Sequence, residues 1–203
     1  MTIQNVKSFA AGQWIGADGS ARDIQSAVSG EVIARAGNST LDTEAMLDFA
    51  RSKGGPALRA MTFHQRAKML KALALHLGQH KQQLYDISFA TGATQKDHLI
   101  DIDGGIGTMF VFASKGRREM PDAQVYLDGE VEQLSRNGTF LGQHICTSLQ
   151  GVAVHINAFN FPVWGMLEKL APTLLAGVPA IVKPATASCY VCLLYTSPSP
   201  RDA

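Results

Sequence analysis

The chain has 203 residues and a mass of 21.8 kDa, enough for one ordinary domain or two small ones. Its 46% apolar and 17% charged residues exclude a disordered or collagen-like chain. A net charge of +1, with no block of like charge, disfavours binding to nucleic acid or to an anionic membrane. Because the sequence has neither a spanning apolar stretch nor an apolar signal segment, we expect a cytoplasmic protein that binds a small molecule.

The first 60 residues change from strand to helix signals. Residues 8–36 contain short apolar pieces separated by turn residues, which predicts a small antiparallel hairpin. From Leu41 the spacing becomes helical, and it predicts a helix that ends at Gly54-Gly55-Pro56. A longer helix is predicted over 62–80, with Thr62 as its cap and one apolar stripe made of Ala67, Met69, Leu70, Leu73 and Leu77.

Two more helices are predicted before residue 120. The first covers 82–91 and is closed by Gly92, and the second runs over 95–118. Glycines at 104, 105 and 107 weaken the second helix, each by about 1 kcal/mol relative to alanine. Since no strand precedes them and no GxGxxG motif is present, we expect these glycines to permit close packing or bending rather than to bind phosphate.

The later part of the chain contains a hairpin and a strand–helix–strand unit. Asn137-Gly138 lies between two extended segments, the strongest short hairpin signal. Buried strands are predicted over 151–156 and 178–184, and the helix between them has Pro162 near its start, Pro172 as a kink and Gly177 past its end. This order predicts a parallel βαβ unit.

Together these elements predict an incomplete α/β fold. N-terminal helices with hairpins occupy 1–150, and the first βαβ unit of a parallel cofactor-binding sheet occupies 151–187. Two parallel strands leave the faces and edges of a sheet uncovered. Residues 188–203 contain Ser-Pro-Ser-Pro, which fits neither a helix nor a central strand, so we interpret this tail as foreign sequence and its Cys-x-x-Cys spacing as meaningless.

Candidate site residues follow the two predicted strands, where open α/β sheets bind their ligands. Asn160 follows the first strand and can donate an N–H to a developing oxyanion, although its residue type alone favours a helix cap. Lys183 follows the second strand and can reach a ribose or phosphate, although such a lysine is more often simply solvated. The pair His76 and His80 lacks the acid of an HExxH motif, so no metal site is predicted.

The segment HINAFNFPVWGMLEKLAPTLLAGVPAIVKPATA resembles the opening of the cofactor domain in the aldehyde dehydrogenase superfamily. Its matching features are N-F-P, a spaced Lys and Pro, a Gly, and a strand that ends in K-P. The stretches over 54–73 and 91–119 extend the resemblance to nearly all of 5–187. Within the superfamily the chain is most similar to the branch that oxidises CoA-linked semialdehydes in aerobic phenylacetate degradation. The benzoate-degradation branch is the alternative.

The resemblance implies NAD(P)-dependent oxidation of an aldehyde to an acid through a cysteine thiohemiacetal. It gives Asn160 the oxyanion role and Lys183 a contact with the adenosine ribose. The nicotinamide side of the cleft would be lined by Ile156, Asn157, Ala158 and Phe159. Many NAD-preferring relatives carry a glutamate where this chain has Thr186, and a carboxylate there would repel a 2′-phosphate. We therefore expect the chain to tolerate NADP and even to prefer it.

The resemblance also places the nucleophilic cysteine and the general-base glutamate beyond residue 187. We therefore expect an N-terminal fragment that is inactive alone, from a homo-oligomeric parent whose substrate is a small CoA-linked aldehyde. The Asn137-Gly138 hairpin resembles the arm through which family members associate. The alternative is a short non-catalytic protein that binds nucleotide or pairs with full-length subunits.

Overall fold

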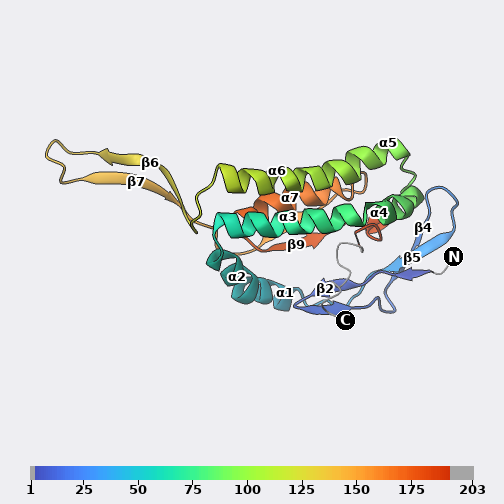
Figure 1. Ribbon diagram of the computed structural model, residues 1–203. Helices are drawn as coiled ribbons and strands as arrows, with labels where there is room; N and C mark the ends of the chain where they lie inside the picture. Colours follow the sequence, from blue (N-terminus) through green and yellow to red (C-terminus); the bar gives the residue numbers. More distant parts are fainter. Residues whose placement is uncertain (1–2, 193–203) are drawn as a thin grey trace.

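The computed structural model describes residues 3–192 (Figure 1). Long helices form the centre of the molecule, short N-terminal strands lie along one side, and a two-stranded arm projects from one end. Two parallel strands lie on the same side of the helices as the N-terminal strands. Within the described residues, no helix combines the length and the hydropathy needed to cross a lipid bilayer.

The N-terminal region contains the predicted hairpin and one further sheet. In the hairpin, β2 and β3 are antiparallel, and Ala11 and Gly12 form its turn with φ values of 49° and 82°. The second sheet has the order β1-β5-β4, in which β1 is parallel to β5. The hairpin prediction is confirmed. The strands are β1 (Gln4–Asn5), β2 (Ser8–Ala10), β3 (Gln13–Ile15), β4 (Arg22–Gln25) and β5 (Val32–Ala36).

The first helical segment does not end where the sequence predicts. Helix α1 (Thr43–Phe49) continues through the π-turn η1 (Ala50–Gly54) into α2 (Gly55–Ala60), so the predicted end at Gly54-Gly55-Pro56 is wrong. The wider π-turn restarts the helical hydrogen bonds after it. Pro56 then lies in the first turn of α2, where a missing N–H has no cost.

The next two helices are confirmed. Helix α3 (Phe63–Gln79) starts at a capping box in which Gln65 N donates to Thr62 Oγ1 at 3.2 Å and Thr62 N donates to Gln65 Oε1 at 2.8 Å. Helix α4 (Lys81–Ser88) runs into the 3₁₀ turn η2 (Phe89–Thr91). Gly92 ends this segment with a φ of 86°.

The predicted helix over 95–118 is confirmed with one modification. It consists of α5 (Gln95–His98), the π-turn η3 (Leu99–Asp103) and α6 (Gly104–Arg118). Helix α6 packs against α3 and against α7 (Trp164–Leu175), and these three helices enclose most of the core. Side chains with 2% exposure or less in this core include Ala67, Leu70, Ala74, Leu77, Ile102, Met109, Leu167 and Ala171.

Close packing explains one of the three glycines near the start of α6. A Cβ on Gly105 would lie 3.0 Å from Trp164 Cα, and one on Gly104 would lie 3.6 Å from the Trp164 ring. The expectation of close packing is therefore confirmed at Gly105, whereas the distance at Gly104 is that of an ordinary van der Waals contact. Gly107 does not pack closely, because a Cβ there would meet nothing within 4 Å.

We expect Gly105→Ala and Gly107→Ala to change stability in opposite directions. The first forces α6 away from the backbone of α7 and should lower the free energy of unfolding by about 1–3 kcal/mol. The second adds a methyl group in open space and should raise it by up to about 1 kcal/mol, because alanine favours the helix. Urea denaturation of the two variants measures both effects, and equal losses would contradict the packing argument.

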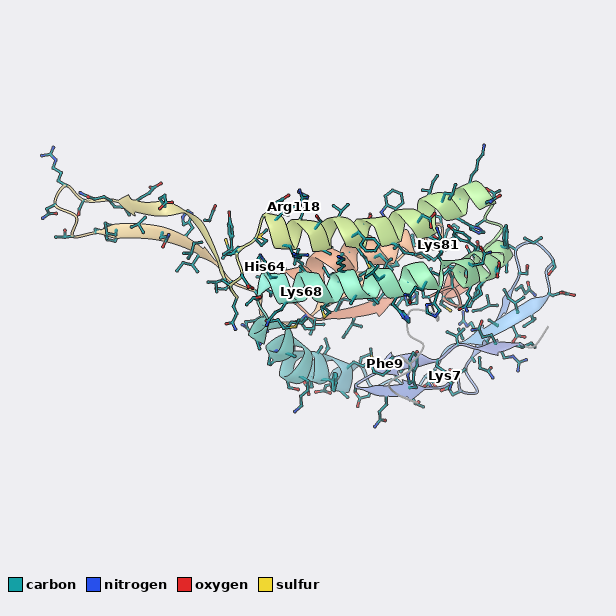
Figure 2. The ribbon with its side chains drawn as sticks, viewed as in Figure 1. Lys7, Phe9, His64, Lys68, Lys81 and Arg118 are labelled. Atoms are coloured by element: carbon teal, nitrogen blue, oxygen red, sulfur yellow. The ribbon has the colours of Figure 1, made fainter. Side chains whose placement is uncertain are left out.

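The arm is the hairpin predicted at Asn137-Gly138. It pairs β6 (Tyr126–Gln133) with β7 (Leu141–Cys146) in antiparallel register, and Gly138 has a φ of 69°. The segment before the arm is tied to the N-terminal end of α3. There Thr62 Oγ1 donates to Asp122 at 2.5 Å, and His64 Nε2 lies 3.0 Å from the Met120 carbonyl oxygen. Figure 2 shows His64 at this end of α3, near the base of the arm.

The predicted βαβ unit is present. Strand β8 (Ala153–Ile156) is parallel to β9 (Ala180–Lys183), with Ile156 opposite Lys183, and α7 connects them. The helix continues through Pro172, and Gly177 follows it with a φ of 80°. Residues 188–192 are buried against the core. The remainder of the predicted foreign tail lies outside the described residues, so that interpretation stays a prediction.

Candidate functional site

The two segments that carry the predicted site residues lie side by side. Strands β8 and β9 are parallel and in register, so their carboxyl ends meet at one edge. The backbone N–H of Asn157 donates to the Lys183 carbonyl at 3.1 Å and extends the pairing by one residue. We call residues 157–162 and 184–188, which follow the two strands, the carboxyl edge.

Asn157 has a buried amide without a partner. The residue is 6% exposed, and neither Oδ1 nor Nδ2 has a hydrogen-bond partner among the described residues. Leaving a buried polar group unpaired costs about 1–3 kcal/mol. Asn157 is therefore a buried polar group at the carboxyl edge that the described residues leave unpaired.

Asn160 does not cap the helix that follows it. Helix α7 begins at Trp164, and its first backbone amides donate to Asp101 instead. Trp164 N lies 2.7 Å and Val163 N lies 3.1 Å from Asp101 Oδ1. The cap interpretation of Asn160 is therefore wrong, and its exposed side chain makes no hydrogen bond within 3–192. This leaves the amide N–H groups of Asn160 available to a ligand.

Asn160 is one of the residues that line an open pocket of about 560 Å³. One wall is the carboxyl edge, and the others come from β4, the turn after α4, and the start of the helix that contains Asp101. The pocket is lined on these other walls by Gln25, Ala27, Ser88, Ala90, Thr91, Gly92, Ala93, Asp97 and Asp101. It brings Asn160 and Asp101, 59 positions apart in the numbering, to one place.

The other predicted site residues are exposed at the same edge. Ile156 is 74% and Phe159 is 68% exposed, and Ala158 between them is also exposed. Lys183 ends β9 as an exposed residue, and Thr186 begins the short 3₁₀ turn η4 (Thr186–Ser188). The structure thus gathers all of the predicted site residues around the ends of two strands.

Asp101 is the residue that sequence reasoning missed. It is 5% exposed, and burial raises its pKa to about 6, although the amides of Trp164 and Val163 favour the ionised form and oppose the shift. Its only sequence signal is an acidic residue between the apolar residues Ile100 and Ile102. Nothing local in the sequence connects it with a helix that starts at Trp164.

The raised pKa of Asp101 gives stability a definite pH dependence. Between the ordinary pKa of 3.8 and the folded value of about 6, the folded chain binds more protons than the unfolded chain. The free energy of unfolding should therefore fall by up to about 3 kcal/mol as pH rises through this range. The Asp101→Asn variant should not show this fall in the free energy of unfolding. Urea denaturation from pH 4 to 7 compares the two, and parallel curves would contradict the assignment.

The thiols within the described residues do not resemble an activated nucleophile. All three cysteines of the sequence are described. Burial raises the pKa of both Cys189 and Cys192, the latter to about 12, which disfavours the reactive thiolate. Cys146 is exposed on β7, in the arm that projects away from the body (Figure 1). The carboxyl edge thus offers hydrogen-bond donors without a neighbouring activated thiol.

The chain is similar to known proteins over most of its length. The model of the Aldehyde dehydrogenase family matches residues 14–197. The 3,4-dehydroadipyl-CoA semialdehyde dehydrogenase of Aromatoleum evansii is 40% identical over 185 residues, which is 91% of this chain and 36% of that protein. The D-glyceraldehyde dehydrogenase (NADP(+)) of Thermoplasma acidophilum is 25% identical over 184 residues, 90% of this chain and 35% of that protein. The chain thus spans about a third of the length of these relatives.

Solved structures share the fold. An NADP-dependent enzyme from E. coli superposes with a TM-score of 0.80 at 23% identity, covering 96% of this chain and 38% of that one. Lactaldehyde dehydrogenase from Escherichia coli gives a TM-score of 0.79 at 20% identity, covering 97% and 39%. The fold is therefore that of a partial aldehyde dehydrogenase, as the α/β prediction and the resemblance implied. By the extent of the family match and the identity to the Aromatoleum evansii relative, the chain belongs to the aldehyde dehydrogenase family.

Proposed function

We propose that the chain forms the N-terminal segment of an NAD(P)-dependent dehydrogenase that oxidises a CoA-linked semialdehyde to the acid. The observation that carries the proposal is the 40% identity to 3,4-dehydroadipyl-CoA semialdehyde dehydrogenase over 91% of the chain. The free Asn160 amide beside the carboxyl edge supports it, because an oxyanion needs such a preorganised donor.

The residues at the carboxyl edge fit a dinucleotide. Lys183 is an exposed cation at the end of β9 and would hold a ribose or phosphate oxygen. The resemblance places Asn157 and Ala158 on the nicotinamide side, where Ile156 and Phe159 offer exposed apolar surface. The nucleotide, when bound, supplies the hydride acceptor. This chain's residues bind and orient it, and Asn160 stabilises negative charge on the aldehyde oxygen.

A substrate comparison tests the proposal. A full-length form, in which this segment is followed by the remaining two thirds or so of the family's chain, should reduce NADP with a CoA-linked semialdehyde. The same semialdehyde without CoA should react with a kcat/KM at least about 10²-fold lower, the loss expected when remote binding energy is removed. Equal rates for the two forms would overturn the CoA link but leave the dehydrogenase activity.

Two substrates in this experiment distinguish the phenylacetate pathway from the benzoate pathway. The semialdehyde from phenylacetate ring cleavage and 3,4-dehydroadipyl-CoA semialdehyde are offered in turn. The identity to the Aromatoleum evansii enzyme favours the second, a benzoate-degradation role, and the resemblance of the longer motifs favours the first. The larger kcat/KM decides between them.

Cofactor choice depends on Thr186 in this proposal. Thr186 is exposed three residues after Lys183, where its hydroxyl would accept or donate a hydrogen bond at a 2′-phosphate. We expect Thr186→Glu to raise the KM for NADP by about 10-fold or more through charge repulsion, with the KM for NAD little changed. Thr186→Gln, which has the same length without the charge, is the control. An equal effect from both would contradict the electrostatic explanation.

We further propose that the arm binds a second copy of the protein. Six large apolar side chains on it are each more than half exposed, namely Leu127, Val131, Leu134, Phe140, Leu141 and Ile145. An exposed two-stranded ribbon of this kind is marginally stable alone and gains stability by pairing or packing. The chain by itself should bind nucleotide weakly and should oxidise no aldehyde, because Cys189 and Cys192 are buried and Cys146 lies on the projecting arm. A cytoplasmic location remains part of the same proposal.

A further inference from the structure

The first turn of α7 is held by a residue from a distant helix. The residue before the helix, Val163, has no polar side chain to cap it, and the two leading amides donate to Asp101 instead. Asp101 is 5% exposed, so these charge-assisted hydrogen bonds are shielded from water. The capping role that normally belongs to the local chain is supplied by the π-turn η3.

We propose that Asp101 is a positioning residue that fixes Asn160 for catalysis by clamping the start of α7, an inference that rests on the proposed oxyanion role of Asn160. The link between the two is short. Only Phe161 and Pro162 separate Asn160 from the first clamped amide, that of Val163. Proline fixes its own φ and restricts the residue before it, so this link has little freedom.

Contacts on other sides make the link stiffer. The Phe161 carbonyl accepts the N–H of Gly165 at 2.9 Å, and the Pro162 carbonyl lies 3.8 Å from the thiol of Cys192. Pro162 itself is buried. The turn between Asn160 and α7 is therefore held from both directions, and Asp101 is the charged member of this set.

The π-turn orients Asp101 toward α7. Two residues further along the same turn, Asp103 accepts from Tyr85 Oη at 2.7 Å and pairs with Lys81 at 3.4 Å, on α4. The two carboxylates of one π-turn thus bind different helices. Gly105 allows the approach, because its missing Cβ would lie 3.0 Å from Trp164 Cα. Asp103 is consequently a matched control that carries the same charge in the same segment.

Loss of the clamp should affect the chemical step more than nucleotide binding. An oxyanion donor acts only when it is placed within a fraction of an ångström, and a shift of 1 Å can cost about 10²-fold in rate. In the full-length form, Asp101→Ala should lower kcat by about 10²-fold, with the KM for nucleotide changed less than about 3-fold. Asp103→Ala should leave kcat within about 3-fold of the unchanged protein.

Conservative variants separate positioning from a general structural role. In Asp101→Asn the Oδ1 atom, which accepts both amides, is retained, so kcat should stay within about 3-fold of the unchanged protein. In Asp101→Glu the carboxylate is retained but displaced by one methylene, so kcat should fall by about 10-fold or more. If the Asp101→Ala variant does not fold, the difference in kcat between Asp101→Asn and Asp101→Glu still tests the positioning role. Equal kcat for these two variants would overturn the inference.

A double-mutant cycle connects Asp101 with Asn160. If Asp101 acts through Asn160, Asp101→Ala combined with Asn160→Ala should reduce kcat no more than Asn160→Ala alone, to within about 3-fold. Multiplicative losses would overturn the inference and leave the proposed function intact. An undiminished kcat in Asn160→Ala alone would instead overturn the oxyanion role, which distinguishes failure of the proposed function from failure of the positioning role.

Discussion

Replacing Asn160 by alanine in the full-length form should lower kcat by about 10²–10³-fold, the usual cost of losing one oxyanion donor. The expectation rests on two observations. Asn160 is exposed and lines the pocket, and the first amides of α7 donate to Asp101, so the Asn160 side chain is not engaged in capping that helix. Because the donor acts on charge that develops only in the transition state, KM for the aldehyde should change little. Steady-state kinetics with saturating NADP measures both constants.

Asn160→Asp provides the control for this loss. It conserves shape but replaces the N–H donor by an acceptor, so its kcat should be at least as low as that of the alanine variant. Stability should be affected little in either, since the Asn160 side chain makes no hydrogen bond within the described residues. A rise in KM with kcat unchanged would assign Asn160 to substrate binding and remove its oxyanion role.

The largest effect on stability is expected from Gly177→Ala, with a loss of about 3 kcal/mol or more in the free energy of unfolding. Gly177 has a φ of 80°, and an added Cβ would overlap Arg66 Nη1 and Ser148 Oγ. The Arg66 side chain cannot move aside easily: it is fully buried, its guanidinium lies 4.4 Å from the centre of the Phe63 ring, and it donates to Ser148 at 3.2 Å.

Gly30→Ala separates backbone strain from the clash. Gly30 has a φ of 73°, close to that of Gly177, but a Cβ there would meet nothing within 4 Å. It should cost only about 1–2 kcal/mol, the price of the left-handed conformation. Urea denaturation of both variants gives the difference. Equal losses would mean that the packing of Arg66 against Gly177 is looser than the distances indicate.

Local signals were sufficient where one element determines its own ends. The capping box at Thr62 fixed the start of α3, and Asn137-Gly138 fixed the turn of the arm. The βαβ unit was also predictable, because its strands are continuous apolar runs and its helix has a periodic face. These features depend on neighbours in the sequence.

Local signals failed where a π-turn or a distant side chain decides the outcome. A Gly-Gly-Pro sequence such as that at 54–56 normally ends a helix. Here the π-turn η1 places Pro56 in the first turn of α2, where its missing N–H donor has no cost. The assignment of Asn160 as a cap failed for a different reason. Its competitor, Asp101, lies 59 positions earlier and reaches α7 only in the folded chain. The family resemblance leads to the proposed oxyanion role of Asn160, but no local signal points to the residue that holds its turn.

A crystal structure of the full-length form with bound NADP tests the central claim most directly, namely that the carboxyl edge of β8 and β9 forms the nucleotide side of an aldehyde-oxidising site. We predict that Lys183 Nζ lies within hydrogen-bond distance of the adenosine ribose and that the nicotinamide lies beside residues 156–160. Thr186 should face the 2′-phosphate. A nucleotide bound elsewhere, with Lys183 solvated and Asn160 facing no part of the substrate, would contradict the account.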